Sequence, residues 1–153
     1  MNKASLLLVI AIFITIASFA QTTEDSVKQV VNNLFIGMKT SNGTMIASAF
    51  ADSEVLQTIS SDKTSGKIGV RNESVKDFAK SISTLAVNAA DERISFNSVK
   101  IDADLASVWT PYQFYFNGKF SHCGVNSFQL VRIYGQWKIQ YLIDTRRKDH
   151  CED

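Results

Sequence analysis

The segment Phe120–Phe128, written "FSHCGVNSF", gathers three side chains that could do chemistry. His122 titrates near neutral pH and could act as a general base. Cys123 could serve as a nucleophile, a metal ligand or half of a disulfide. Asn126 offers hydrogen-bond donors and an acceptor. The elements that carry this segment decide which of these roles are open to it.

A zinc site and a catalytic thiol are both disfavoured. His122-Cys123 and His150-Cys151 supply the residue types of a tetrahedral zinc site. Adjacent residues on a strand point to opposite faces, so His122 and Cys123 cannot reach one ion without a bulge, and we expect no metal. No neighbouring base would orient Cys123 as a nucleophile. A disulfide between Cys123 and Cys151 is favoured over both roles, and the spacing alone leaves it open.

Hydrophobic periodicity predicts an α+β chain with this segment in its second half. Apolar residues at helical spacing from Val27 to Met38 predict a helix from Thr22 onward, and shorter helices follow at residues 44–50 and after Ser74. Between these two helices the pattern predicts brief strands at residues 55–60 and 68–70. Long β segments separated by short turns then predict an antiparallel meander, at residues 94–101, 105–116, 119–133 and 137–147.

The last hairpin decides which side chains face inward. A two-residue turn at Gly135-Gln136 would place Thr145 opposite Asn126. The odd-numbered residues from Trp137 to Ile143 are apolar, so the pattern predicts that they face the core and that Asp144 lies on the outer side.

The preceding hairpin allows two registers. A three-residue loop at residues 116–118 sets Tyr112 opposite His122, whereas a two-residue Asn117-Gly118 turn sets Gln113 there. The first is preferred because it brings Val108 and Phe114 to the core. The predicted inner face then carries a set of candidate ligand-binding residues: Tyr112, His122, Asn126, Tyr141, Thr145 and Arg147. The alternative is that these residues are satisfied internally and brace a bent sheet.

The ends and the charge of the chain indicate its compartment. Residues 1–20 carry one cation, Lys3, then an apolar run and a small-residue end, which is typical of a secretory signal peptide. Residues 21–153 are then one domain, secreted or periplasmic, with no membrane span after cleavage. Without Lys3 the 16 basic residues fall to 15 against 15 acidic ones, which disfavours a nucleic-acid partner.

Residues 108–148 resemble a known family. "VWTPYQFYFNGKFSHCGVNSFQLVR", "GQWKI" and "DTRRK" are similar to segments of exported bacterial proteins named for lumazine binding, within the nuclear transport factor 2-like superfamily. The resemblance implies a cone-shaped α+β fold, with helices packed on a strongly curved antiparallel sheet and a pocket between them. The superfamily includes enzymes and binding domains, so the fold alone does not choose between them.

The expected function is therefore the binding of a small, aromatic molecule without catalysis and without a cofactor. Tyr112 and Tyr141 would form its aromatic walls, and Arg147 would hold a negative or carbonyl group. The first alternative is an enzyme like ketosteroid isomerase or the polyketide cyclases, with His122 as base; no carboxylate of the long strands is predicted to face it. The second is a homodimeric interaction domain that pairs through an apolar outer sheet face: Val125, Val131, Ile133 and Leu142.

Overall fold

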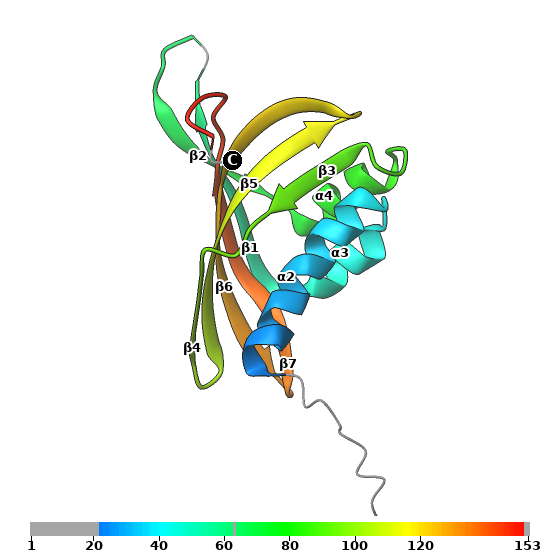
Figure 1. Cartoon of the computed structure of the whole chain (residues 1–153), viewed down its shortest axis with the longest axis vertical. Helices are drawn as coiled ribbons and strands as arrows, with labels where there is room; N and C mark the ends of the chain where they lie inside the picture. Colours follow the sequence, from blue (N-terminus) through cyan, green and yellow to red (C-terminus); the bar gives the residue numbers. More distant parts are fainter. Residues whose placement is uncertain (1–21, 63, 152–153) are drawn as a thin grey trace, which may run out of the picture.

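The computed structural model describes residues 22–62 and 64–151, and the predicted signal peptide at residues 1–20 lies outside them. Three helices and seven strands follow one another in an α+β arrangement (Figure 1). The helices are α2 (Thr23–Lys39), α3 (Gly43–Ala49) and α4 (Val75–Ser83). The strands are β1 (Phe50–Ser61), β2 (Ile68–Glu73), β3 (Ala90–Ile94), β4 (Ser98–Asp102), β5 (Leu105–Phe116), β6 (Lys119–Ile133) and β7 (Gln136–Thr145).

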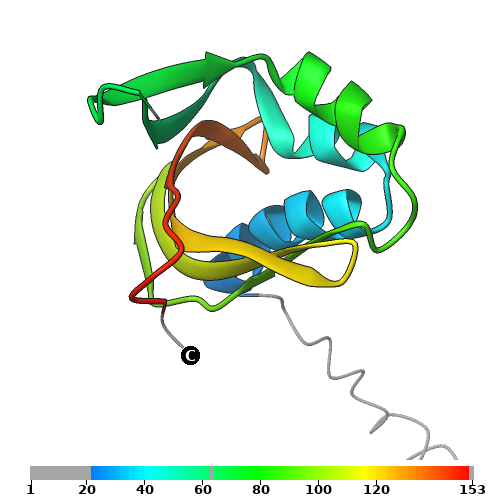
Figure 2. The same ribbon diagram turned by 90° about the horizontal axis from the view of Figure 1, so that it is seen from above.

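Helix α2 forms where the sequence predicts it. Thr22 caps it and exchanges hydrogen bonds with Asp25 in a capping box, which satisfies free N–H groups of the first turn. Its apolar stripe packs into the sheet, where the Phe35 ring meets Phe128 edge to face at 6.2 Å between centroids. Figure 2 shows this helix lying inside the curve of the sheet. The helix therefore supplies one wall of any space that the sheet encloses.

The seven strands form one curved sheet in the order β2-β1-β7-β6-β5-β3, with β4 also paired to β5. The predicted antiparallel meander is confirmed for β5, β6 and β7. Strand β1 lies parallel to β7, so the sheet is mixed rather than wholly antiparallel. The predicted strand at residues 94–101 is wrong in its bounds, because β3 ends at Ile94 and β4 begins at Ser98. The α+β fold class itself is confirmed.

The predicted register of the β6–β7 hairpin is wrong. The turn is Tyr134-Gly135, with φ of 49° and 80°, and it pairs Ile133 with Gln136. Positive φ at both central residues matches the twist of the flanking strands, which favours this turn. Further along, Leu130 pairs with Ile139 but Gln129 pairs with Tyr141, so Gln140 is an extra residue on β7.

That bulge reverses which side chains of β7 face the helices. Ile139 is buried before it, and beyond it Leu142 and Asp144 are the buried residues. Asp144 was expected on the outer side and lies on the inner one. Conversely, Tyr141 and Thr145 were expected on the inner face and leave it.

The β5–β6 hairpin also contains a bulge. Asn117 and Gly118 make a two-residue turn with φ of 49° and 74°, not the preferred three-residue loop. Tyr115 pairs with Phe120 but Phe114 pairs with His122, so Ser121 is the extra residue. The predicted pairing of Tyr112 with His122 is therefore wrong. Because the bulge restores the parity, Tyr112, His122 and Asn126 still share the inner face.

A disulfide ties the end of the chain to this hairpin. Cys123 and Cys151 are bonded, with 5.7 Å between their Cα atoms, and the backbones of Cys123 and Arg147 exchange two hydrogen bonds. Cys123 lies on the face opposite to His122, as strand alternation predicts, and the disulfide-bonded tail leaves it 1% exposed. Residues 146–151 are thus held beside the polar end of the inner face.

Candidate functional site

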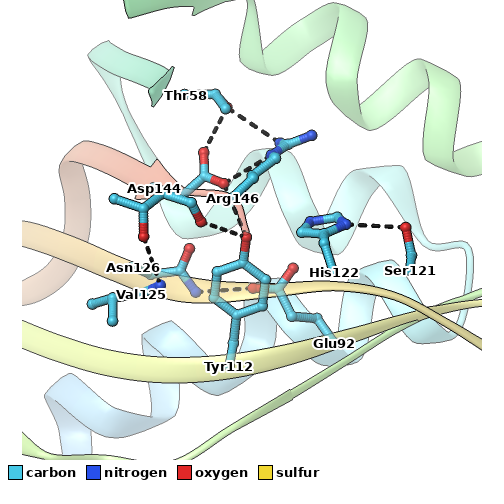
Figure 3. A network of polar contacts seen from close by, with 10 residues as sticks. Thr58, Glu92, Tyr112, Ser121, His122, Val125, Asn126, Asp144 and Arg146 are labelled. Atoms are coloured by element: carbon cyan, nitrogen blue, oxygen red, sulfur yellow. Dashed lines mark hydrogen bonds and ion pairs between the residues drawn. The ribbon is translucent and has the colours of Figure 1, made fainter. Parts of the chain in front are cut away.

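The inner face of the sheet and the helices enclose a cavity of about 120 Å³, which adjoins a second of about 60 Å³. Helices α2 and α4 supply apolar walls through Met38 and Phe78, which line both cavities. The sheet supplies the opposite, polar wall (Figure 3). The polar residues that line one or both cavities are Thr58, Glu73, Glu92, Tyr112, His122, Asn126, Asp144 and Arg146.

Glu92 lies at the centre of the polar wall and lines both cavities. Its Oε1 accepts a hydrogen bond of 2.9 Å from Asn126 Nδ2. The protein encloses this carboxylate, although the cavity leaves part of its surface accessible. Burial raises the pKa of Glu92 to about 7, the Asn126 hydrogen bond opposes that rise and the Asp144 charge adds to it. At neutral pH this side chain therefore exists in both protonation states.

Asp144 and Arg146 form an ion pair beside Glu92. Arg146 Nε donates to Asp144 Oδ2 at 2.9 Å, and Thr58 Oγ1 donates to Oδ1 at 2.5 Å. Arg146 also reaches Thr58 Oγ1 through Nη2 at 3.2 Å. The Asp144 side chain is 10% exposed and that of Arg146 is 43% exposed, so the pair runs from the interior to the cavity mouth. The parallel pairing of Thr58 with Asp144 brings this group together.

Tyr112 spans the gap between β5 and β7. Its hydroxyl lies 2.8 Å from the Thr145 carbonyl oxygen and 3.2 Å from Asp144 Oδ2, both of which accept its proton. Burial, with the charges of Glu92 and Asp144 next in order, raises the pKa of Tyr112 well above its usual value. Tyr112 is therefore neutral, and its proton is engaged within the protein.

His122 lies next to Tyr112 and Phe114. Its Nδ1 is 3.0 Å from Ser121 Oγ, and its ring centroid is 5.1 Å from that of Phe114. Burial, followed by the Arg146 charge, lowers the pKa of His122. A neutral ring at physiological pH leaves Nε2 open toward a ligand, since no described residue bonds to it.

Comparison with known proteins rests on structure. No family model matches the chain, and no curated protein matches it. A nuclear transport factor 2-like protein of unknown function from Shewanella baltica is similar, with a TM-score of 0.62, 13% identity and coverage of 81% of this chain and 93% of that one. A cystatin-like domain of unknown function from Nostoc punctiforme has a TM-score of 0.65 and 15% identity, with coverage of 84% and 81%. The chain has a nuclear transport factor 2-like fold.

The predicted ligand residues of this nuclear transport factor 2-like domain separate into two groups. Tyr112, His122 and Asn126 line the cavities, as the inner-face prediction required. The other three do not line them, because the β7 bulge turns them away. Tyr141 donates to Gln57 Oε1 at 2.7 Å, Thr145 Oγ1 accepts from the Val125 amide at 3.1 Å, and Arg147 donates to the His150 carbonyl.

Three carboxylates that line the cavities, those of Glu73, Glu92 and Asp144, are absent from the predicted ligand residues. The predicted face of Asp144 is wrong, and the predicted strands at residues 68–70 and 94–101 leave out both Glu73 and Glu92. The immediate neighbours of Glu92, Asp91 and Arg93, are charged and give no strand pattern. Only the pairing of β3 with β5, Glu92 opposite Phe114, brings it to the cavity. A parity count that began from the apolar Leu142 would have turned Asp144 inward.

A larger hollow of about 570 Å³ lies between α3, α4 and the start of β1. Its charged side chains include Asp52, Lys76 and Lys80, which are exposed to solvent. Exposed charges of both signs are typical of an ordinary surface groove, whereas the inner cavity concentrates buried polar groups. We therefore take the inner cavity as the functional site. Among the described residues, no group of His, Cys, Asp or Glu side chains is placed to hold a metal ion.

Proposed function

We propose that this chain is an exported, non-catalytic binding domain that holds a small molecule in the inner cavity, in the manner of the lumazine-binding-like proteins. The observation that supports this proposal is the contrast between the apolar helical wall and the polar sheet wall of the cavity. Met38 and Phe78 offer apolar surface to a flat molecule, while Glu92 and His122 retain hydrogen-bonding atoms that face the cavity. A polar wall built only to brace the sheet would engage those atoms internally.

The volume limits the occupant. A cavity of about 120 Å³ is well below the ~300–1,000 Å³ typical of drug-sized ligands. The ligand is therefore small, or it inserts one ring and leaves the rest at the mouth beside Arg146. No helix in residues 22–62 and 64–151 is long and apolar enough to span a membrane. The proposed export rests on the signal-like composition of residues 1–20.

Native mass spectrometry of protein isolated from its source tests this proposal. We expect a bound small molecule that dissociates on unfolding. Phe114→Trp adds bulk to the cavity lining and should abolish the bound species, while Tyr115→Trp, on the next residue and the opposite face, should retain it. Equal occupancy in both variants, or a wild-type protein that carries nothing and binds nothing, contradicts the proposal.

A catalytic role is the second candidate, because the structure supplies the inward carboxylate that the sequence did not. Glu92 has a pKa of about 7 and lies in a cavity with His122, and groups that titrate near the working pH suit proton transfer. A turnover that Glu92→Gln abolishes while binding persists would establish catalysis. Retained turnover in that variant would exclude Glu92 as the proton-transfer group.

A homodimer is the third candidate, carried by the outer sheet face. Leu105, Trp109 and Ile133 are 49%, 46% and 40% exposed on it, beside the half-buried Val131. Leu142, which was predicted for this face, lies on the inner one. Trp109→Lys should convert a dimer to a monomer in light scattering, and a wild-type monomer would contradict pairing.

A further inference from the structure

The charges that line the inner cavities are unbalanced. Three carboxylates lie on their walls, those of Glu73, Glu92 and Asp144, against the single guanidinium of Arg146. His122 adds no charge when it is neutral, and the lowered pKa favours that form. An anionic ligand would enter a site whose net charge is negative whether Glu92 is ionised or protonated. Such a ligand is disfavoured at short range in a low-dielectric site.

The one cation is already engaged. Arg146 Nε lies 2.9 Å from Asp144, and Nη2 lies 3.2 Å from Thr58 Oγ1. Freeing it for a ligand anion would leave the buried Asp144 carboxylate without its counter-ion, which is a costly state. Asp144 therefore offsets the charge of Arg146, and the N–H groups that remain on the Arg146 guanidinium offer a ligand carboxylate or phosphate little net attraction.

Among the described residues, Glu92 is the one carboxylate that lines both cavities and keeps an oxygen open to them, since Asp144 is paired with Arg146 and Glu73 lines only the smaller cavity. Asn126 Nδ2 occupies Oε1, and no described residue donates to Oε2. Asn126 Nδ2 thereby fixes the carboxylate in place and leaves its second oxygen as an acceptor. Tyr112 adds an oxygen lone pair and no proton, because its hydroxyl already donates to the Thr145 carbonyl and Asp144. Glu92 and Tyr112 thus present acceptors, and their complement is a group rich in N–H donors. The role of His122 Nε2 depends on its tautomer, so it can serve such a ligand as a further acceptor when the ring proton is on Nδ1.

We infer that the cavity selects a small planar nitrogen base of the amidine or amino-heterocycle type, whose N–H groups donate to Glu92 while its apolar part lies against Met38 and Phe78. This inference rests on the proposed binding function and names its ligand class. A planar cationic N–C–N unit matches a carboxylate in shape and charge. Its flat face also suits a cavity bounded by aromatic and thioether side chains.

The same geometry makes binding depend on pH. The polar and titratable groups that line the cavities with Glu92 all come from the sheet or its end: Tyr112 on β5, His122 and Asn126 on β6, Asp144 and Arg146 at β7, Thr58 on β1 and Glu73 on β2. Helices α2 and α4 contribute only apolar side chains to this lining. A cationic ligand binds the ionised carboxylate, and with a pKa of about 7 the ionised fraction falls about tenfold from pH 8 to pH 6. Affinity should fall by about the same factor, and ligand binding at pH 6 should release the proton that Glu92 carries there.

Acetamidinium, acetamide and acetate test this inference because they share one shape and differ in charge. Each would be titrated into the full domain, with binding followed through the Asn126 side-chain amide by NMR at matched ionic strength. We expect acetamidinium to bind about tenfold more tightly than acetate at pH 8, with acetamide between them. Glu92→Gln should remove the preference over acetamide. Glu54→Gln makes the same chemical change outside these cavities and should retain it.

The outcomes separate this inference from the proposed function. Preferential binding of acetate or acetamide in the cavity would overturn the ligand class and leave the binding function standing. A preference for acetamidinium that survives Glu92→Gln would also overturn it. If none of the three probes shifts the Asn126 amide, the ligand class is wrong, while the native mass spectrum still decides independently whether the cavity holds a small molecule.

Discussion

Glu92→Gln should change how the stability of this domain depends on pH. Glutamine keeps the size of the side chain and removes its charge. The pKa of Glu92 is about 7 in the folded protein against 4.5 for a free glutamate, because burial disfavours the carboxylate. Between these values the folded chain holds a proton that the unfolded chain has released. The stability from the protonated carboxyl is therefore complete below about pH 4.5 and is lost as pH rises through about 7.

The size of the effect follows from that difference. A shift of this size corresponds to about 3 kcal/mol, since each pKa unit is ~1.4 kcal/mol. The wild type should lose about this much unfolding free energy, relative to the variant, between pH 5 and pH 8. For a domain of this length that is a difference in Tm on the order of 10 °C.

Urea unfolding followed by tryptophan fluorescence at several pH values measures this directly. The quantity of interest is the free energy of unfolding of the variant minus that of the wild type. This difference should rise with pH for Glu92→Gln. The same difference for the control variant Glu54→Gln should show no rise of that size between pH 5 and pH 8. Parallel curves for Glu92→Gln and the wild type from pH 5 to pH 8 would refute the assignment of a buried, proton-binding carboxyl at this position.

Further predictions concern the framework of the site. Gly124→Ala should destabilise the domain by more than ~3 kcal/mol in urea unfolding, because a Cβ there would collide with the Thr145 carbonyl and lie 2.8 Å from the Tyr112 ring. Gly69→Ala is the control: a Cβ there has nothing within 4 Å, and the variant should stay within ~1 kcal/mol of the wild type. Equal effects of the two substitutions would contradict the close approach of the backbone at Gly124. Asp144→Asn should cost about 1.5–3 kcal/mol in the same assay, because charge-assisted hydrogen bonds to a buried carboxylate are lost, and a neutral result would contradict the ion pair. Replacing both Cys123 and Cys151 by serine should cost about 3–4 kcal/mol for a 28-residue separation, and an oxidised protein whose intact mass does not change on reduction would exclude the bond.

Much of the fold could be predicted because it depends on local patterns. The bounds 105–116 and 119–133 coincide with β5 and β6, and the cap at Thr22 and the stripe of α2 follow from residue types alone. Inner-face parity was right for Tyr112, His122 and Asn126. The bounds and the cap need only neighbours in the chain, whereas the parity held because the bulge at Ser121 offset the difference between the predicted three-residue loop and the observed two-residue turn.

The remaining errors in register come from the two hairpin turns, which differ from the predicted ones, and from single extra residues in the strands. The bulges at Ser121 and Gln140 each shift the register by one position, and no residue type at either position marks them. At Gln140 the shift exchanged Tyr141 and Thr145 for Leu142 and Asp144 on the inner face. A strand period of two makes every such slip a change of face, so the charge character of the site was predicted incorrectly.

Glu92 escaped prediction for a different reason. Its segment is short and polar, and only long-range pairing with β5 places it beneath α2 and α4. A buried carboxylate is costly, so propensity and hydrophobic pattern both argue against finding one there. Buried ionisable groups that go against the hydrophobic pattern are concentrated at functional sites. For this reason the position of Glu92 had to come from the structure and not from the sequence.

The central claim is that the inner cavity is where this domain binds its ligand. An NMR comparison of the protein as isolated with the same protein after its small molecule has been removed tests that claim most directly. The account predicts that the largest shifts occur at the Asn126 side-chain amide and at the neighbouring Tyr112 and His122. Shifts centred instead on Thr44 and Lys76 in the outer groove, or identical spectra, would contradict it.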